Sequence, residues 1–246
     1  MQLIGSAGDV LRAAISEGRW ALDVYESLTL VSSYGIEVCE TRLARSPDEA
    51  VAHAEEIGYP VVLKVASPDV LHKSDVGGLA VGLSSPAEVR AAYSRLVEAV
   101  RSKAPHARLR GVVVQEMVEG GYEAIVGGYV DDQFGPVVMY GLGGVLVELF
   151  RDVAFEIAPV TEAEALEMVS RTKSFRVLTG YRGRPRADVR ALCRLISRAS
   201  QMAWELRNVV RELDMNPVFV LPEGSGCKVA DARVVLKQPG PAAPTP

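Results

Sequence analysis

The stretch from Tyr59 to Gly82 reads YPVVLKVASPDVLHKSDVGGLAVG, and it decides more about this chain than any other segment. An apolar β-rich run ends by presenting Lys64, and the pair Gly77-Gly78 closes the loop that follows. A lysine ammonium at a strand end suits phosphate, because a compact charge imposes no single binding geometry. Paired glycines let backbone N–H groups approach an anion closely. The segment favours a phosphate site, with a solvated strand-end lysine as the open alternative.

The polar loop inside this stretch carries His72 and Lys73. The other two histidines, His53 and His106, fall in a predicted helix and in a predicted helix-to-strand loop. A neutral imidazole offers a nucleophilic nitrogen at physiological pH. His72 is therefore the candidate nucleophile, although a lone loop histidine is more often structural or merely exposed.

Three helix starts can be placed by their caps. Ser46, Ser85 and Thr161 are each followed by a glutamate three residues later, and the first two are followed directly by proline. This is the capping-box pattern, with proline at the first helical position. We expect a helix to begin at each of these residues.

Strand-like runs lie between the helices, and several follow one another without a helix between them. This mixed order favours the α+β class over a doubly wound parallel sheet. It also suggests a domain boundary near residue 110, where the strands become consecutive. The expected strands are Ile36–Leu43, Pro60–Val65, Leu79–Leu83, Gly111–Val118, Tyr122–Val130, Pro136–Tyr140, Asn208–Val220 and Cys227–Leu236.

The segment Gly111–Gly128 (GVVVQEMVEGGYEAIVGG) is a strand, a glycine turn and a second strand that begins near Glu123. Backbone groups of such a connection can read the edge of an adenine, and a glutamate can accept from ribose hydroxyls. Taken alone, the pattern favours an ordinary hairpin.

The segment Val210–Pro217 (VRELDMNP) places Glu212, Asp214 and Asn216 on one face of an extended strand. Three oxygen-bearing side chains on one face suit a hard cation such as Mg²⁺. Asp231, on the next predicted strand, would lie across the hairpin. A solvated edge face is the alternative here.

The run Gly141-Leu142-Gly143-Gly144 does not make a dinucleotide-binding fingerprint. It lacks the full glycine spacing, and no helix with a downstream acidic residue follows it. We expect a tightly packed or phosphate-approaching turn instead.

The composition limits the class of protein. A hydrophobic fraction of 48% and a charged fraction of 24% are typical of a globular protein, and the net charge of −4 argues against a nucleic-acid partner. No apolar run reaches the roughly 20 residues of a membrane-spanning helix, and no signal peptide is expected. Three widely spaced cysteines form no disulfide or zinc pattern, so we expect a cytoplasmic location.

Three stretches together resemble the ATP-grasp β subunit of ADP-forming acyl-CoA synthetases, distant relatives of succinyl-CoA synthetase. They are PVVLKVASPDVLHKSDVGG, FGPVVMYGLGGVLVELFRD and ELDMNPV, and the resemblance runs from about Trp20 to Leu236. It implies an ATP-grasp fold of two α+β subdomains that hold a nucleotide between them. The implied division is an N-terminal extension (1–19), a first subdomain with a mobile His72 loop (20–109), a second subdomain with the nucleotide and Mg²⁺ site (110–236), and a disordered tail (237–246).

The resemblance also implies roles for individual residues. Lys64 would bind ATP phosphates, and Glu123 would lie near the nucleotide. Asp214 would steady a phosphohistidine, and His72 would be the histidine that is phosphorylated. The adenine hinge would be Gln115, Glu116, Met117 and Val118, and the Mg²⁺ ligands would be Asn216 and Asp231.

The implied activity is that of a ligase, acetate–CoA ligase (ADP-forming) type, with Mg²⁺ as cofactor and ATP or ADP as substrate. His72 would relay a phosphoryl group between Mg-ADP and a partner α subunit. That subunit would carry the CoA-binding and acyl-phosphate site, and the assembly would be an α2β2 heterotetramer. Two alternatives stay open, namely a different ATP-grasp carboxylate ligase that needs no histidine and a non-catalytic adenine-nucleotide sensor.

Overall fold

The computed structural model describes residues 7–70, 72–143 and 152–237. Their strands form two separate sheets, one of four strands and one of six, and every strand pair is antiparallel. Helices accompany both sheets, so the expected α+β class is confirmed. The expected disordered tail and Gly144 of the glycine run lie outside the described residues, apart from Lys237.

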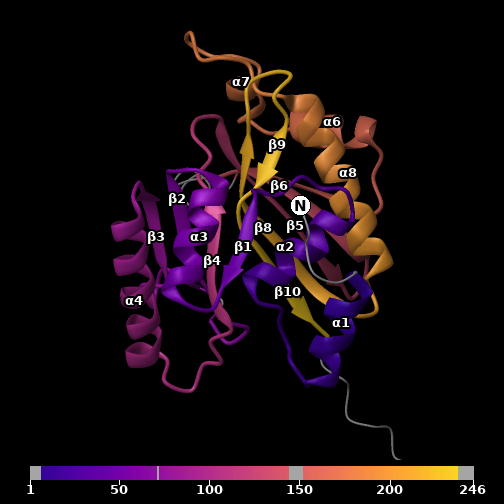
Figure 1. The fold of residues 1–246 in the computed structure, drawn as a ribbon. Coiled ribbons are helices and arrows are strands. Elements are labelled where there is room, and N and C mark those ends of the chain that lie inside the picture. Colours follow the sequence, from indigo (N-terminus) through magenta and orange to yellow (C-terminus); the bar gives the residue numbers. More distant parts are fainter. Residues whose placement is uncertain (1–6, 71, 144–151, 238–246) are drawn as a thin grey trace, which may run out of the picture.

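The small sheet has the strand order β1-β4-β2-β3 and lies at the left of Figure 1. Helices α3 and α4 cover one of its faces. Its elements are β1 (Thr41–Ala44), α3 (Pro47–Ile57), β2 (Val61–Ala66), β3 (Leu79–Leu83), α4 (Pro86–Lys103) and β4 (Gly111–Glu116).

The large sheet has the order β10-β8-β5-β6-β7, and β9 pairs with β8 beyond the end of β10. Helices α6 and α8 pack on one of its faces, and α2 packs on β10. The strands are β5 (Tyr122–Asp131), β6 (Gly135–Leu142), β7 (Val153–Ile157), β8 (Val210–Val220), β9 (Cys227–Val229) and β10 (Ala232–Leu236). The helices are α1 (Ala7–Ser16), α2 (Val24–Ser33), α6 (Glu162–Ser170), α7 (Phe175–Leu178) and α8 (Val189–Glu205).

The caps read from the sequence begin the helices as expected. The side chains of Ser46, Ser85 and Thr161 accept hydrogen bonds from the backbone three residues later. Only at Thr161 is the box reciprocal, because Glu49 and Glu88 instead accept from the N–H of the residue before the cap. Thus the hydroxyl fixes each helix start, while the glutamate can satisfy either neighbouring N–H.

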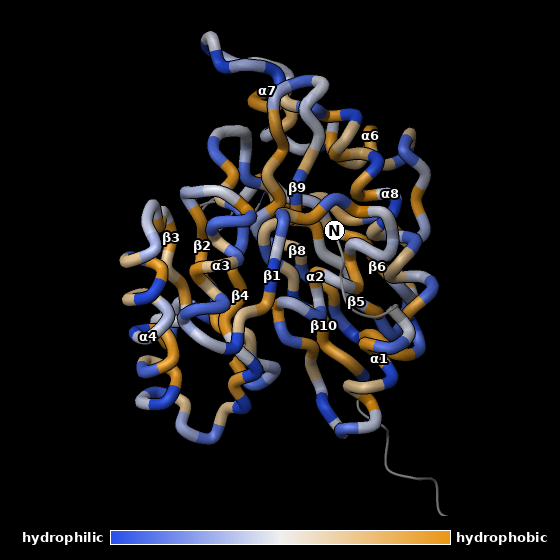
Figure 2. Tube along the Cα trace, viewed as in Figure 1, coloured by the Kyte–Doolittle hydropathy of each residue, from blue (hydrophilic) through white to orange (hydrophobic). Residues whose placement is uncertain are grey.

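Each sheet has its own hydrophobic core, and β4 contributes to both. Val112 and Val114 point into the small core with α3 and α4, whereas Val113 points into the large core. This follows from the alternation of side chains along a strand. In Figure 2 the hydrophilic residues of α4 lie on its outer side, away from the sheet. The small sheet therefore lies between its own helices, α3 and α4, and the part of the chain that contains the large sheet, called the large domain below; the small sheet with α3 and α4 is the small domain.

Several elements differ from the sequence-based expectation. The run Ile36–Leu43 forms a strand only from Thr41, and the expected strand Cys227–Leu236 is broken into β9 and β10. Helices α1 and α2, which were not predicted, pack into the large core, although Asp23 and Glu26 form a capping box at the start of α2. Strand β4 follows residue 110 but pairs in the small sheet. The predicted domain limits stay a prediction.

A buried charge cluster joins the two sheets at the base of α2. Glu26 accepts hydrogen bonds from Arg19 Nη1 and Nη2 at 2.6 and 3.0 Å, and it also contacts Arg110. Arg110 further pairs with Asp23 at 3.0 Å, and its backbone N–H donates to Ala66 at the end of β2. The cluster thus fixes the small sheet to α2.

No helix among the described residues has the length and apolar character needed to cross a bilayer.

The cluster makes a stability prediction. Glu26→Gln removes the carboxylate that faces Arg19, whose side chain is only 2% exposed. Leaving a buried guanidinium without its full counter-charge should lower the free energy of unfolding by about 2–4 kcal/mol, measured by urea titration at pH 7.

Glu17→Gln is the matched control. Glu17 also faces Arg19, at 2.7 Å from Nε, but its own side chain is 58% exposed. Because an exposed ion pair contributes little, this variant should lose less than about 1 kcal/mol. Equal losses of unfolding free energy in the two variants would contradict the conclusion that the buried ion pair with Glu26 stabilises the fold.

Candidate functional site

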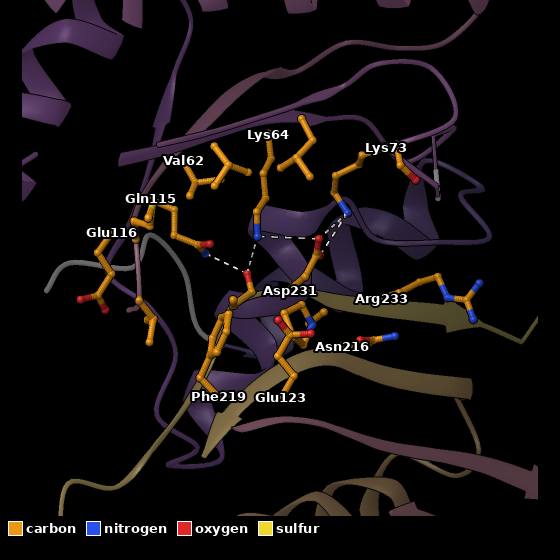
Figure 3. Close-up of a pocket in the computed structure, with 18 of the residues that line it drawn as sticks. Val62, Lys64, Lys73, Gln115, Glu116, Glu123, Asn216, Phe219, Asp231 and Arg233 are labelled. Carbon is orange, nitrogen blue, oxygen red and sulfur yellow. Dashed lines mark hydrogen bonds and ion pairs between the residues drawn. The ribbon is translucent and has the colours of Figure 1, made fainter. Parts of the chain in front are cut away.

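A cleft of about 740 Å³ lies where the two sheets face each other. The small sheet and the loop after β2 supply one wall, and β8 with the β9–β10 connection supplies the other (Figure 3). Ten of the residues singled out in the sequence line it: Lys64, His72, Gln115, Glu116, Met117, Val118, Glu123, Asp214, Asn216 and Asp231. The structure therefore brings these side chains to one place, while their individual roles stay predictions.

Lys64 is buried rather than solvated, so the alternative of a strand-end surface lysine is wrong. Only 5% of the residue is exposed, and Nζ donates to the Ala230 carbonyl at 2.8 Å. Gln115 Nε2 donates to the same carbonyl at 2.9 Å. Burial lowers the pKa of Lys64, and the nearby Asp231 carboxylate partly opposes this shift. The ammonium is thus fixed at the floor of the cleft.

Asp231 lies in the break between β9 and β10, not within a strand as the sequence suggested. The break faces Asn216 and Pro217 of β8, where Asn216 N–H donates to the Asp231 carbonyl at 3.1 Å. Because proline has no N–H to donate, the regular strand ladder cannot continue at this point. The interruption turns the Asp231 carboxylate into the cleft.

Lys73 is a charged residue of this site to which the sequence assigned no role. Its Nζ lies 3.0 Å from each carboxylate oxygen of Asp231, a residue 158 positions away. Figure 3 shows Lys64 and Lys73 reaching Asp231 from the same side. The only signal in the sequence was its place beside His72.

The carboxylate of Asp214, on β8, has several charged side chains around it. Burial raises its pKa, Arg233 partly offsets the rise, and the acids Glu212 and Asp231 add to it. The side chain of His72 is close enough to Asp214 to lower the same pKa. The predicted alternation along β8 is confirmed, because Leu213 and Met215 are buried whereas Glu212, Asp214 and Asn216 are not. Of these three polar residues, Asp214 and Asn216 line the cleft and Glu212 does not. Asp214 and His72 therefore share one part of the cleft.

One end of the cleft is apolar. Leu79 and Val81 of β3 are 42% and 59% exposed and line this end. Met117 and Phe219 also line the cleft, Phe219 from β8 in the opposite wall. Exposed apolar side chains that converge on a cleft suit a flat aromatic ligand such as a nucleobase.

The carboxylate of Glu116 is held at the edge of this wall. It accepts from Lys228 Nζ at 2.8 and 2.9 Å and from the Glu40 N–H at 2.8 Å. The bonds from Lys228 connect strand β4 of the small sheet to strand β9 of the large sheet. The Glu116 side chain thus helps to join the two sheets.

The glycine pair closes the loop from outside the cleft lining. Gly78 N–H donates to the Lys73 carbonyl at 2.6 Å and Gly77 N–H to the Ser74 carbonyl at 3.0 Å. A Cβ on Gly78 would lie 2.5 Å from Val65 Cγ2, and Gly77 has a φ of +73°. These N–H groups are used within the loop, so a phosphate role for the pair stays a prediction.

The acidic side of the cleft fits a magnesium ion. Asp231 already attracts two ammonium groups, and Asn216 and Asp214 line the same wall. Among the described residues no cluster of three or more His, Cys, Asp or Glu could hold a metal by itself. A cation here would complete its oxygen coordination with water and, when a nucleotide is bound, with phosphate oxygens, which is the arrangement typical of Mg²⁺.

The raised pKa of Asp214 has a measurable consequence. A carboxyl group whose folded-state pKa is raised stabilises the fold only at low pH, and this contribution is lost as the pH rises through that pKa. Asp214→Asn should therefore melt at a higher temperature than the unchanged chain at pH 7–8. The difference should disappear below about pH 4, where both side chains are neutral.

Asp131→Asn is a control of opposite sign. Backbone N–H groups of Phe134 and Gln133 lower the pKa of the exposed Asp131, so its carboxylate stabilises the fold above that pKa. This variant should melt lower at neutral pH, with the loss shrinking in acid. Circular dichroism melts from pH 3.5 to 8 test both, and a lower melting temperature for Asp214→Asn at pH 7 would contradict the buried-carboxylate account.

Comparison with known proteins places this geometry in a family. The family model described as ATP-grasp domain matches residues 13–236. The β subunit of acetate–CoA ligase (ADP-forming) II from Pyrococcus furiosus is 39% identical over 95% of this chain and 99% of that subunit.

Solved structures agree in fold. The dinucleotide-forming acetyl-coenzyme A synthetase 1 of Ca. Korarchaeum cryptofilum, in complex with coenzyme A, Ca-AMPCP and HgCl+, is similar with a TM-score of 0.90 and 46% identity, over 94% of this chain and 100% of that one. A second structure of that protein has a TM-score of 0.82 and 44% identity over the same shares. It holds coenzyme A and Mg-AMPPCP, with its phosphohistidine segment pointing towards the nucleotide-binding site. The chain described here belongs to the ATP-grasp family, among the β subunits of ADP-forming acetate–CoA ligases.

Proposed function

We propose that this chain is the β subunit of an ADP-forming acyl-CoA synthetase and that it moves a phosphoryl group between His72 and Mg-bound ADP. The observation that carries the proposal is the convergence in one cleft of a loop imidazole, a carboxylate, a buried ammonium and two oxygen ligands. These are His72, Asp214, Lys64, Asn216 and Asp231. The net reaction is acyl-CoA + ADP + phosphate = acid + ATP + CoA.

His72 is the nucleophile of the transfer. One imidazole nitrogen takes the phosphoryl group, and a P–N bond then breaks as the terminal phosphate oxygen of ADP forms the new P–O bond. Asp214, by accepting from the other ring N–H, fixes the tautomer and supports positive charge on the ring. Both side chains line the same cleft, and the charge of His72 acts to lower the pKa of Asp214, which supports this pairing.

Lys64 provides a fixed positive charge for the phosphates. Its ammonium is held by the Ala230 carbonyl and is little exposed. It therefore does not have to move when charge develops on the transferring group. Asn216 and Asp231 would hold Mg²⁺, which when bound neutralises phosphate charge. The apolar wall that includes Leu79 and Val81 would receive the adenine ring, and the hinge Gln115–Val118 would read its edge.

The partner is an α subunit that carries the CoA-binding and acyl-phosphate site, in an α2β2 heterotetramer. The relative from Pyrococcus furiosus is itself named a β subunit. Phosphate displaces CoA from the acyl group on α, and the phosphoryl group passes through a histidine of α to His72. The cytoplasm is the proposed compartment, in keeping with three cysteines that are free and buried.

Labelling tests the proposal directly. The chain is incubated with Mg²⁺ and ATP labelled at the γ-phosphate, and the label is tested for loss in acid and retention in alkali. His72→Asn should abolish the label, whereas His106→Asn, a matched change at an exposed histidine, should retain it within about twofold.

The alternatives predict other results. A nucleotide sensor would bind Mg-nucleotide but take no label, even with the α subunit present. A ligase working through a free acyl phosphate would keep full activity in His72→Ala. Either result would overturn the histidine relay.

A further inference from the structure

The ammonium of Lys73 sits where a cation is expected. It lies 3.0 Å from both oxygens of Asp231, which makes a symmetrical ion pair with a side chain that would bind Mg²⁺. The two side chains are 13% and 21% exposed, so the pair is largely shielded from water. Both oxygens of this metal ligand are thus occupied by a residue of the chain itself.

Two lysines approach Asp231, and they differ in how firmly they are held. Lys64 extends from the buried strand β2, lies 3.8 Å from the carboxylate and is anchored on the Ala230 carbonyl. Lys73 belongs to the loop between β2 and β3, next to His72. The Lys64 ammonium therefore has an acceptor outside the carboxylate, whereas the bonds of the Lys73 ammonium go to Asp231 itself.

The ion pair also ties the His72 loop across the cleft. Within the described part of the loop, residues 72–77, the Lys73 ammonium reaches the large domain at Asp231. A second lysine, Lys103 of α4, donates to the Asp75 carbonyl at 3.3 Å from the small domain. The loop is therefore held on the large domain by the Lys73–Asp231 contact and on its own domain by Lys103.

We propose that Lys73 is a positioning residue that takes the place of the divalent cation at Asp231, so that arrival of Mg²⁺ displaces it and releases the His72 loop. The inference rests on the proposed function. A divalent ion bound to either oxygen of Asp231 would lie within a few ångströms of the ammonium, and like charges at that distance repel strongly in a shielded site. One carboxylate cannot hold both cations well.

The replacement of Lys73 by Mg²⁺ at Asp231 would set the order of events in the phosphoryl relay. While the metal site is empty, the loop stays docked and His72 stays beside Asp214. Once Mg-ADP is bound, Lys73 is free and the loop can travel to collect a phosphoryl group that ADP is ready to accept. The displaced ammonium remains one residue from His72, where it can offset the phosphoryl charge.

The first test measures metal binding without nucleotide or activity. Mn²⁺ is titrated into the full chain, and free Mn²⁺ is followed by electron paramagnetic resonance. Lys73→Met should bind Mn²⁺ about three- to tenfold more tightly than the unchanged chain, the effect of removing one partly buried competing ion pair. Lys73→Arg keeps the competing charge and should stay close to the unchanged chain.

Lys103→Met is the matched control. It removes the other lysine that holds the loop but leaves Asp231 untouched, so its Mn²⁺ affinity should be unchanged. If Lys73→Met and Lys103→Met tighten Mn²⁺ equally, the effect comes from loop loosening and the inference is overturned. Equal affinity in all four proteins, or weaker binding in Lys73→Met, overturns it as well.

A second readout uses the unchanged chain and does not depend on folding of a variant. Hydrogen exchange of the amides from His72 to Gly78 is followed by mass spectrometry with and without Mg²⁺. Exchange should become faster when Mg²⁺ is added, and no change or slower exchange contradicts the displacement. Labelling of His72 is measured separately, so normal labelling with a failed metal test rejects the Lys73 inference and leaves the proposed function standing.

Discussion

The Ala230 carbonyl is the point on which the two halves of this structure depend. It accepts from Lys64 of β2 and from Gln115 of β4, which lie 166 and 115 positions away in the chain. Both donors are buried, and a buried ammonium without a partner would carry a large desolvation cost. The small sheet can therefore satisfy its own polar side chains only when it stands in this orientation to the large one. The same bonds that connect the two sheets hold Lys64, the lysine proposed to bind phosphate, in place.

The acceptor exists because β8 cannot pair continuously. Pro217 removes one backbone donor, the partner strand is split into β9 and β10, and the residues at the split turn their polar groups into the cleft. A regular strand would have used the Ala230 carbonyl in its ladder and directed Asp231 by simple alternation. Function is thus placed at a defect in the sheet, which is a common position for a side chain that must be aimed.

The sequence predicted those features that depend on residues close together in the chain. Alternation along β8 separates the faces of Asp214 and Leu213 within a few residues, and N-cap hydroxyls such as Ser46 bond within one helical turn. The contact of Lys73 with Asp231 has no such local signature, because it depends on how two sheets pack. The break before β10 was not predicted for the same reason. Residues 227–236 have a uniformly strand-like sequence, and the interruption is imposed by the neighbouring strand β8. Helix α2 was missed although Asp23 and Glu26 form a capping box at its start, because most of the helix is buried and it shows no polar face.

The electrostatics of the cleft reconcile a binding site with a stable fold. Asp214 and Asp231 stand on the same wall, and burial raises the pKa of Asp214, so this wall works against folding until cations face it. Arg233 and Lys73 supply that charge from the chain itself. A cleft built to receive Mg²⁺ and phosphates must alternate between an empty state and a loaded state, and each state needs its charges balanced. A movable ammonium meets both needs, since it neutralises the acids when the cleft is empty and yields to a doubly charged ion when the nucleotide arrives. Placing that ammonium beside His72 makes the electrostatic change at the metal site and the movement of the phosphoryl carrier the same event.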